Sequence, residues 1–195
     1  MSKLYFVHIP KCGGSQLKHH FINYGHKSVS ELPTKLKKFT IVRNPYDRFI
    51  SAYFYLQQGG AFDKHNRHLV EKFQDFKDIT AFIDVLYKEA RTTQPLYHRV
   101  TSNDFVNVVH FRPMYTFICN KKNEITIDSV YRFENFNENV KAIFKKYEIK
   151  TKVKKTNSSI HQDYMYYFGS FNKDTIRKFN YIYRKDFEMF NYKLL

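Results

Sequence analysis

The sequence has 195 residues, 43% of them hydrophobic, which is enough for one sizeable core and too little for two independent enzymatic domains. Its 33 Lys and Arg residues outnumber 18 Asp and Glu residues, and the resulting net charge of +15 favours an anionic partner. No stretch approaches the roughly 20 apolar residues that span a bilayer, and no signal peptide is recognisable, so we expect a soluble chain.

The charge and the cysteines narrow these expectations. Residues 1–60 carry nine basic and two acidic side chains, whereas residues 61–120 carry eight and seven, so the first third is the better candidate for an anion site. Cys12 and Cys119 are the only cysteines, which implies no disulfide framework and fits a reducing compartment. We expect a single domain over residues 1–195.

The first element in the chain is a predicted strand, loop and helix. Residues 4–9 form a nearly continuous apolar run, typical of a buried strand, and the run ends at Pro10 and the pair Gly13-Gly14. A segment without Gly or Pro then runs from Ser15 to Tyr24 and predicts a helix.

The same order recurs in the second element. Residues 39–42 read as another buried strand, and Asn44-Pro45 supplies an N-cap residue followed by Pro at the first helical position. The predicted helix runs to about Leu56, with Asp47 near its positive end. It should bury Phe49, Ile50, Tyr53 and Leu56.

The rest of the chain predicts further alternation. Residues 57–77 look like an excursion over the surface. We expect helices over 79–91 and 135–147, short strands over 115–119 and 129–133, and a closing helix or pair of helices from Lys173. Alternating strands and helices predict an α/β fold with a central parallel sheet flanked by helices, binding ligands at the carboxyl ends of its strands.

The glycine loop carries the first chemical signal. Backbone N–H groups at a loop-to-helix junction point together at an anion, and Lys11-Cys12-Gly13-Gly14-Ser15 adds a lysine and a hydroxyl. The nucleotide-triphosphatase signature places its lysine after the glycines, whereas Lys11 precedes them. Arg43, not an acidic magnesium ligand, follows the second strand, which disfavours a metal-dependent kinase. We predict no metal site.

Two segments resemble a known family. Residues 6–15, FVHIPKCGGS, resemble the 5'-phosphosulfate motif I-P-K-T-G-G-T-S of Golgi-type carbohydrate sulfotransferases and their bacterial relatives. Residues 41–53, IVRNPYDRFISAY, are similar to that family's 3'-phosphate motif V-R-D-P-[FY]-x-R-x-x-S-x-[YF]. Residues 110–113, 132–136 and 182–192 also look like later family blocks. Departures are Cys12 for Thr, Ser15-Gln16 for Thr-Ser, and Asn44 for Asp.

The resemblance implies a P-loop-like fold that binds 3'-phosphoadenosine-5'-phosphosulfate (PAPS), and it implies roles for particular residues. Lys11 would contact the 5'-phosphosulfate and neutralise the leaving phosphate oxygen. Arg43 and Ser51 would hold the 3'-phosphate. For Arg48, bracing of the helix and ligand contact stay open, and Asp47 is read as structural. The loop residues expected at the donor are Cys12, Gly13, Gly14, Ser15 and Gln16.

Transfer to an alcohol needs a proton acceptor, and a histidine suits that task near neutrality. His26 lies between the two motifs, in the interval where relatives that sulfate heparan sulfate carry their catalytic histidine, so the resemblance favours His26. His19 and His20 are the fallbacks, and His8 is read as a core residue. His110 is a weaker candidate, and Glu31 is a rival because another branch of the superfamily uses a glutamate.

The sequence therefore predicts in-line sulfuryl transfer from PAPS to a hydroxyl, most readily of a carbohydrate, with a histidine as general base. The alternatives are a non-catalytic binder of nucleotides or polyanions, and a P-loop-type kinase. The partner would be a glycan or another hydroxyl-bearing acceptor, with anionic ones favoured by the charge; no nucleic-acid signature is present. The basic run 150–159 would close over the adenosine, meet a polyanionic acceptor, or be a solvated loop.

Location follows from the same features. Eukaryotic relatives are usually anchored in the Golgi membrane by an N-terminal helix, and this sequence begins shortly before its first predicted strand. We expect a cytoplasmic enzyme of a microbe or of a virus-infected cell, or else the trimmed catalytic domain of a Golgi-lumen enzyme.

Overall fold

The computed structural model describes residues 4–17, 19–22, 25–33, 35–60, 67–76, 78–94, 96–97, 104–149 and 160–195. The chain forms two compact units. The first takes in residues 1–44, 96–101 and 114–157, and the second takes in residues 45–95, 102–113 and 158–195. The single domain over residues 1–195 stays a prediction.

The first unit is built on a parallel sheet of three strands, in the order β1-β2-β3. The strands are β1 (Leu4–Val7), β2 (Lys37–Val42) and β3 (Ser129–Arg132). In the register, Phe6 of β1 lies beside Phe39 of β2, and Phe39 lies beside Ser129 of β3. All four residues of β1 are buried, which explains why this strand reads as a continuous apolar run. All three strands were predicted from the sequence.

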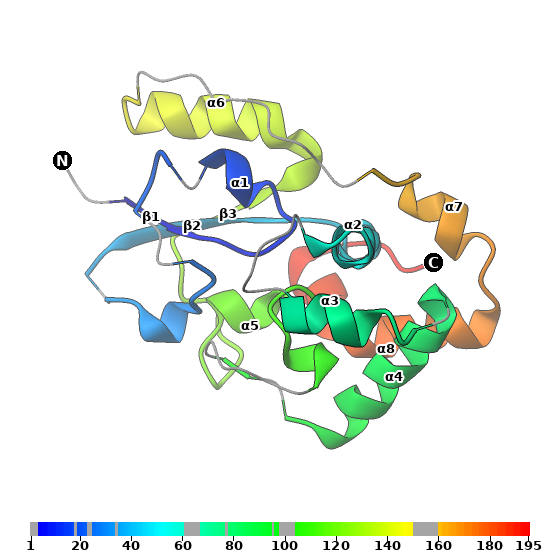
Figure 1. The fold of residues 1–195 in the computed structure, drawn as a ribbon. Helices are drawn as coiled ribbons and strands as arrows, with labels where there is room; N and C mark the ends of the chain where they lie inside the picture. The colour runs from blue at the N-terminus through cyan, green and yellow to red at the C-terminus, as the bar shows by residue number, and fades with distance from the viewer. Residues whose placement is uncertain are drawn as a thin grey trace. The chain divides into compact units, whose positions relative to one another are not determined.

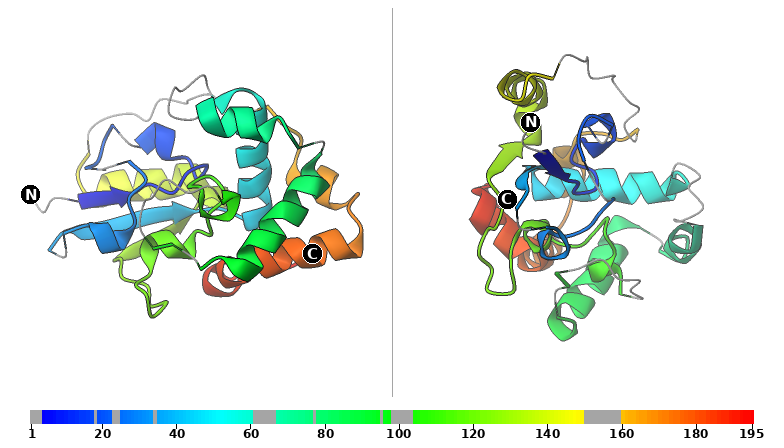
Figure 2. Two further views of the ribbon diagram at one scale, coloured as in Figure 1. Left: turned by 60° about the horizontal axis from the view of Figure 1, so that its bottom comes forward. Right: turned by 90° about the vertical axis from the view of Figure 1, so that its left-hand side faces the viewer.

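Helices cover both faces of this sheet (Figures 1 and 2). On one side lie α6 (Phe136–Lys146) and the short α1 (Gly14–Leu17), and on the other lies α5 (Tyr115–Ile118). The α6 side is an aromatic layer, in which the Phe21 ring packs 4.8 Å from that of Phe39 and 5.9 Å from that of Phe144, centroid to centroid. The structure thus confirms the predicted α/β class, a parallel sheet flanked by helices.

The helix predicted over residues 15–24 is wrong beyond Leu17, where α1 ends. The chain instead returns beside the outer edge of β1, where the Phe6 backbone N–H donates to the Ile22 carbonyl at 2.9 Å and Tyr5 forms a parallel bridge with Ile22. An open strand edge has backbone groups to satisfy, and pairing them outweighs the weak helical preference of a short segment.

The strand predicted over residues 115–119 is also wrong. Tyr115–Ile118 form α5, in which all four side chains are buried, and only Cys119 makes a bridge, an antiparallel one with Ile125. A short run of continuous apolar residues fits a buried strand and a buried helical turn equally well, so periodicity could not decide between them.

The second unit is helical in its described residues. Its helices are α2 (Pro45–Gln57), α3 (Arg67–Phe73), α4 (Ile79–Thr92), α7 (Tyr164–Phe168) and α8 (Lys173–Phe190), with a 3-10 turn over Phe105–Asn107. The predicted helices at 45–56, 79–91 and from Lys173 are confirmed. Tyr183 interrupts α8 with φ −105° and ψ 15°, so the closing element is two helical halves across a kink. The basic run 150–159 and residues 61–66 of the predicted surface excursion lie outside the described residues.

An aromatic core holds the second unit together. Phe82 of α4 is fully buried, and its ring lies 4.7 Å from that of Phe111 and 5.0 Å from that of Phe73, centroid to centroid. The α2 residues that the sequence predicted to be buried all are: Phe49, Ile50, Tyr53 and Leu56. Packing in this core therefore explains why these aromatic residues are present in the sequence.

We expect Phe82→Ala to lower the free energy of unfolding by about 3–5 kcal/mol, because it removes a ring from the centre of this cluster and leaves a cavity. Tyr166→Ala is the control, since Tyr166 is 69% exposed and should change stability by no more than about 0.5 kcal/mol. Urea unfolding followed by circular dichroism measures both. Equal midpoints for the two variants would contradict a core centred on Phe82.

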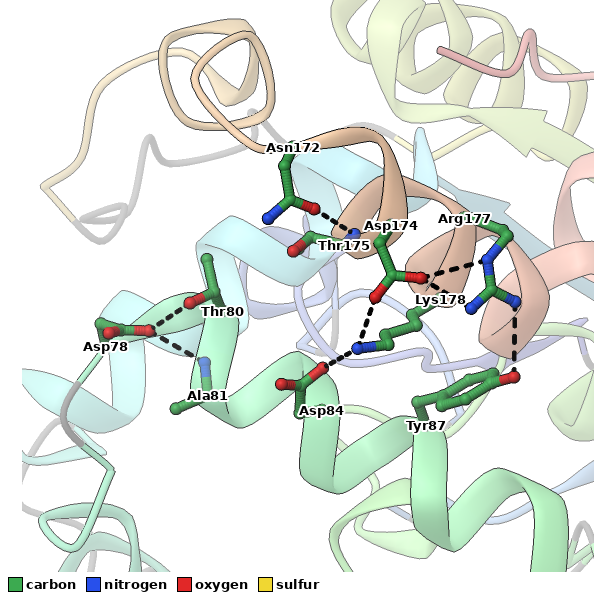
Figure 3. Close-up of polar contacts among 10 residues, drawn as sticks. All are labelled: Asp78, Thr80, Ala81, Asp84, Tyr87, Asn172, Asp174, Thr175, Arg177 and Lys178. Atoms are coloured by element: carbon green, nitrogen blue, oxygen red, sulfur yellow. Dashed lines mark hydrogen bonds and ion pairs between the residues drawn. The ribbon is translucent and has the colours of Figure 1, made fainter.

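Polar contacts join α4 and α8 at their surface (Figure 3). The Lys178 ammonium lies 2.8 Å from Asp84 of α4 and 2.7 Å from Asp174 of its own helix. Asp78 and Asn172 cap the first turns of α4 and α8 through the backbone N–H groups of Ala81 and Thr175, each at 2.9 Å. Because these ion pairs lie at the surface, where solvent weakens them, the buried rings dominate stability.

Candidate functional site

The glycine loop follows β1 and turns sharply before α1. Lys11 and Gly13 have positive φ angles, 67° and 79°. The left-handed conformation suits Gly13, whereas for Lys11 it costs about 1–2 kcal/mol. Strain of this kind persists where the surroundings impose it, and it gathers at ligand-binding segments.

The two glycines have packing reasons as well. A Cβ added to Gly13 would lie 2.5 Å from Cε2 of Phe136, and one added to Gly14 would lie 1.8 Å from Cδ2 of His8. Both distances are far below any van der Waals contact. The loop can therefore pass between the aromatic pair Phe133 and Phe136 and the imidazole of His8 only because both positions lack a side chain.

Arg43, directly after β2, ties the end of that strand to the loop. Its Nη1 donates a hydrogen bond of 2.9 Å to the carbonyl oxygen of Lys11, and its guanidinium carbon lies 4.4 Å from the centroid of the Phe133 ring. The hydrogen bond holds the strained Lys11 peptide, and the ring contact orients the guanidinium through a cation–π interaction. A planar guanidinium so held is suited to bind a phosphate.

The loop therefore gathers positive charge in a partly buried place. Burial, aided by the nearby positive charge of Arg43, lowers the pKa of Lys11 to about 8 from its ordinary 10.5. An anion bound between Lys11 and Arg43 would relieve both effects, since it stabilises each cation. The geometry favours a multiply charged anion at the carboxyl end of β1 and β2.

His26 reaches the same region through His8. The Nδ1 atom of His26 lies 3.1 Å from the backbone oxygen of His8, and the two imidazole centroids are 4.5 Å apart. Because the His8 ring also touches Gly14, the structure brings His26 close to the start of α1, 18 residues on from His8 in the sequence. Sequence reasoning could place His26 in the interval between the two motifs, but not beside the loop.

The remaining predicted loop residues differ in what they present. Cys12 is 1% exposed and its thiol lies 3.9 Å from the sulfur of Met114, so its side chain faces the interior. Ser15 is exposed at the start of α1, and the Gln16 backbone N–H donates to the Gly13 carbonyl at 3.2 Å. Ser51 belongs to α2 in the second unit, where it is 4% exposed.

Other candidates have structural contacts. The Arg48 guanidinium is 2% exposed and donates to the carbonyls of Arg112 at 2.9 Å and Val109 at 3.1 Å, so it braces α2 through backbone oxygens. The Glu31 carboxylate accepts from the Ser28 backbone N–H at 2.8 Å as part of a capping box.

The other candidate histidines pack against aromatic rings. His110 stacks on Tyr55 in the second unit, with ring centroids 5.3 Å apart. The fallback His20 makes an edge contact with Phe144.

Three contributors to this site were given no role in it from the sequence: His8, which was read as core, and the aromatic pair Phe133 and Phe136. Residues 132–136 carried a likeness to a family block, which was the one signal for the pair. For His8 the signal is its spacing, two residues after Phe6 and just beyond the end of β1. Its ring stacks on that of Phe6 at 5.5 Å and lies against Gly14 of the loop.

The comparison with protein families agrees with this geometry. The sequence model of the sulfotransferase family matches residues 1–193, nearly the whole chain, and the chain therefore belongs to the sulfotransferase family. Its class is thus that of transferases that move a sulfuryl group. No curated protein and no solved structure matched the chain.

Within the described ranges, no group of three or more His, Cys, Asp and Glu side chains is arranged to hold a metal ion. Among the helices that the structure describes, none is both long and apolar enough to cross a membrane.

Proposed function

We propose that the protein transfers the sulfuryl group of PAPS to a hydroxyl of an acceptor, a carbohydrate in the first place, with His26 as general base. One observation carries the proposal: two cations, Lys11 and Arg43, and the imidazole of His26 gather around one glycine loop in a member of the sulfotransferase family. A donor with phosphate and sulfate groups supplies the anion that these cations need.

The loop residues fit such a donor. Lys11 would neutralise the oxygen on which charge develops as the sulfur–oxygen bond to the phosphate breaks. Gly13, Gly14, Ser15 and the adjoining Cys12 and Gln16 would surround the 5' end, with Cys12 contributing main chain because its thiol is buried against Met114. Arg43 and Ser51 would take the 3'-phosphate, one by a charged fork and one by a hydroxyl.

The proposed transfer moves one sulfuryl group and one proton. Bound PAPS would supply the sulfuryl group and a good leaving group, adenosine 3',5'-bisphosphate. The acceptor oxygen forms a bond to sulfur as the bond from sulfur to the 5'-phosphate oxygen breaks. His26 takes the hydroxyl proton as the oxygen attacks and becomes an imidazolium, and Lys11 faces the new charge on the leaving phosphate.

A transfer assay tests this function. The purified protein is incubated with radiolabelled PAPS and a panel of glycosaminoglycans, other glycans and small alcohols, with EDTA and separately with Mg²⁺. We expect label on a carbohydrate hydroxyl in both conditions. Magnesium-dependent turnover of ATP without sulfuryl transfer would instead indicate a kinase, and tight bisphosphate binding without transfer to any acceptor a non-catalytic binder.

The lowered pKa of Lys11 predicts a pH dependence of donor-site binding. Only the protonated amine attracts a phosphate, so affinity for adenosine 3',5'-bisphosphate should fall as the pH rises past about 8. Between pH 7 and pH 9 the dissociation constant should rise about tenfold, as one proton is lost per binding site. Titration calorimetry measures it. Lys11→Arg, which stays charged, should show a flat profile, and an equally flat wild-type profile would contradict the assignment.

A further inference from the structure

The imidazole of His8 fills the space between the glycine loop and His26. It is 9% exposed, its ring stacks on Phe6 at 5.5 Å, and it touches the Cα side of Gly14, where a methyl group would come within 1.8 Å of Cδ2. The His26 ring also packs against it, with centroids 4.5 Å apart and a tilt of 52°. His8 therefore sets the spacing between the start of α1 and His26.

The main chain of His8 also acts on His26. Its carbonyl oxygen lies 3.1 Å from Nδ1 of His26. A carbonyl oxygen can only accept a hydrogen bond, so the proton of neutral His26 must be on Nδ1. The lone pair that could accept a proton is then on Nε2, at the opposite corner of the ring.

We propose that His8 is the positioning residue for His26: its carbonyl fixes the tautomer with Nε2 as the proton acceptor, and its ring fixes the plane of the imidazole and its distance from the loop. This rests on the proposed function, in which His26 is the base. His8 itself touches no reacting atom. Gly14 completes the device, because only a residue without a side chain lets the His8 ring reach α1.

Truncation and rescue test the ring. In His8→Ala, His26 loses the surface that orients it, so kcat should fall about 100-fold, the effect of displacing a catalytic group by about 1 Å. The dissociation constant of adenosine 3',5'-bisphosphate should change less than twofold, because Lys11 and Arg43 are untouched. His8→Phe restores a ring in the same space and should recover most of the lost kcat.

Phe21→Leu is the matched control for packing. Phe21 also packs on Phe6, with ring centroids 6.4 Å apart, and it packs on Phe39 and Phe144 as well. It should lose stability while keeping kcat. If His8→Ala keeps kcat near the wild-type value, or if Phe21→Leu loses as much kcat as His8→Ala, the positioning role is refuted and His8 is a packing residue.

A spectroscopic measurement tests the same role without any activity. Imidazole nitrogen shifts of protein labelled with nitrogen-15 histidine report which ring nitrogen is protonated, and the signal missing from His26→Gln assigns His26. We expect the Nδ1–H form in wild type and in His8→Phe. We expect a mixture of tautomers in His8→Ala, because the carbonyl remains but the ring that holds the His26 imidazole against it is gone. A wild-type Nε2–H form overturns the proposal. Absence of sulfuryl transfer in wild type, with the expected shifts, removes the proposed function and leaves the positioning intact.

Discussion

Lys11→Ala is expected to lower kcat for sulfuryl transfer by about 10³-fold, the upper range for removing one donor that stabilises transition-state charge. The reason is local: in the proposed mechanism Lys11 meets the charge that develops on the leaving phosphate oxygen. Burial and the nearby charge of Arg43 lower its pKa to about 8, and a bound anion would offset both effects. Steady-state kinetics with radiolabelled PAPS measure it.

Two variants control this result. Lys37→Ala removes an exposed lysine at the start of β2 and should keep kcat within twofold of wild type. Lys11→Arg keeps the charge in a wider group and should recover only part of the rate, since a planar guanidinium does not reproduce the position of a compact ammonium. A loss in Lys37→Ala equal to that in Lys11→Ala would mean that overall charge, and not the loop, drives transfer.

His26→Ala is expected to lower kcat by about 10³-fold, within the range for loss of a general base, and to leave the affinity for adenosine 3',5'-bisphosphate unchanged. We expect kcat to fall without a change in affinity because His26 contacts His8, whereas the cations of the loop are Lys11 and Arg43. Kinetics and calorimetry on the same preparation measure both.

His20→Ala tests whether His20, and not His26, is the general base. His20 packs edge-on against Phe144 of α6, and its removal should change kcat less than threefold. If His20→Ala lowers kcat as much as His26→Ala does, His20 would be the better candidate for the general base. An unchanged kcat in His26→Ala would remove His26 from the mechanism.

The sequence predicted the sheet and most helices because their signals are local. A buried parallel strand reads as an apolar run, and Asn44-Pro45 marks the start of α2 whatever surrounds it. The two errors arose where non-local contacts decide. Ile22 leaves the predicted helix to pair with β1, and residues 115–118 coil into α5 although their apolar run suits a strand.

The residues of the candidate site also fall into those that a local motif predicts and those that it does not. Lys11, the two glycines and Arg43 could be predicted because each belongs to a contiguous motif. The neighbours that shape them could not, since Phe133 and Phe136 lie 90 or more residues further on and the His8 ring acts through a contact at Gly14 that only the folded chain makes. A motif identifies the groups that meet a ligand and omits the groups that hold them in place.

The double engagement of Arg43 limits what any single substitution there can reveal. The guanidinium supports the Lys11 peptide and rests on the Phe133 ring, and it is also the proposed partner of the 3'-phosphate. Truncating it would relax a left-handed residue of the loop at the same moment as it removed a positive charge. A double-mutant cycle with Phe133 is therefore needed to separate the two contributions of Arg43. Its coupling energy measures how much the Phe133 ring supports the guanidinium, apart from what the guanidinium contributes to ligand binding.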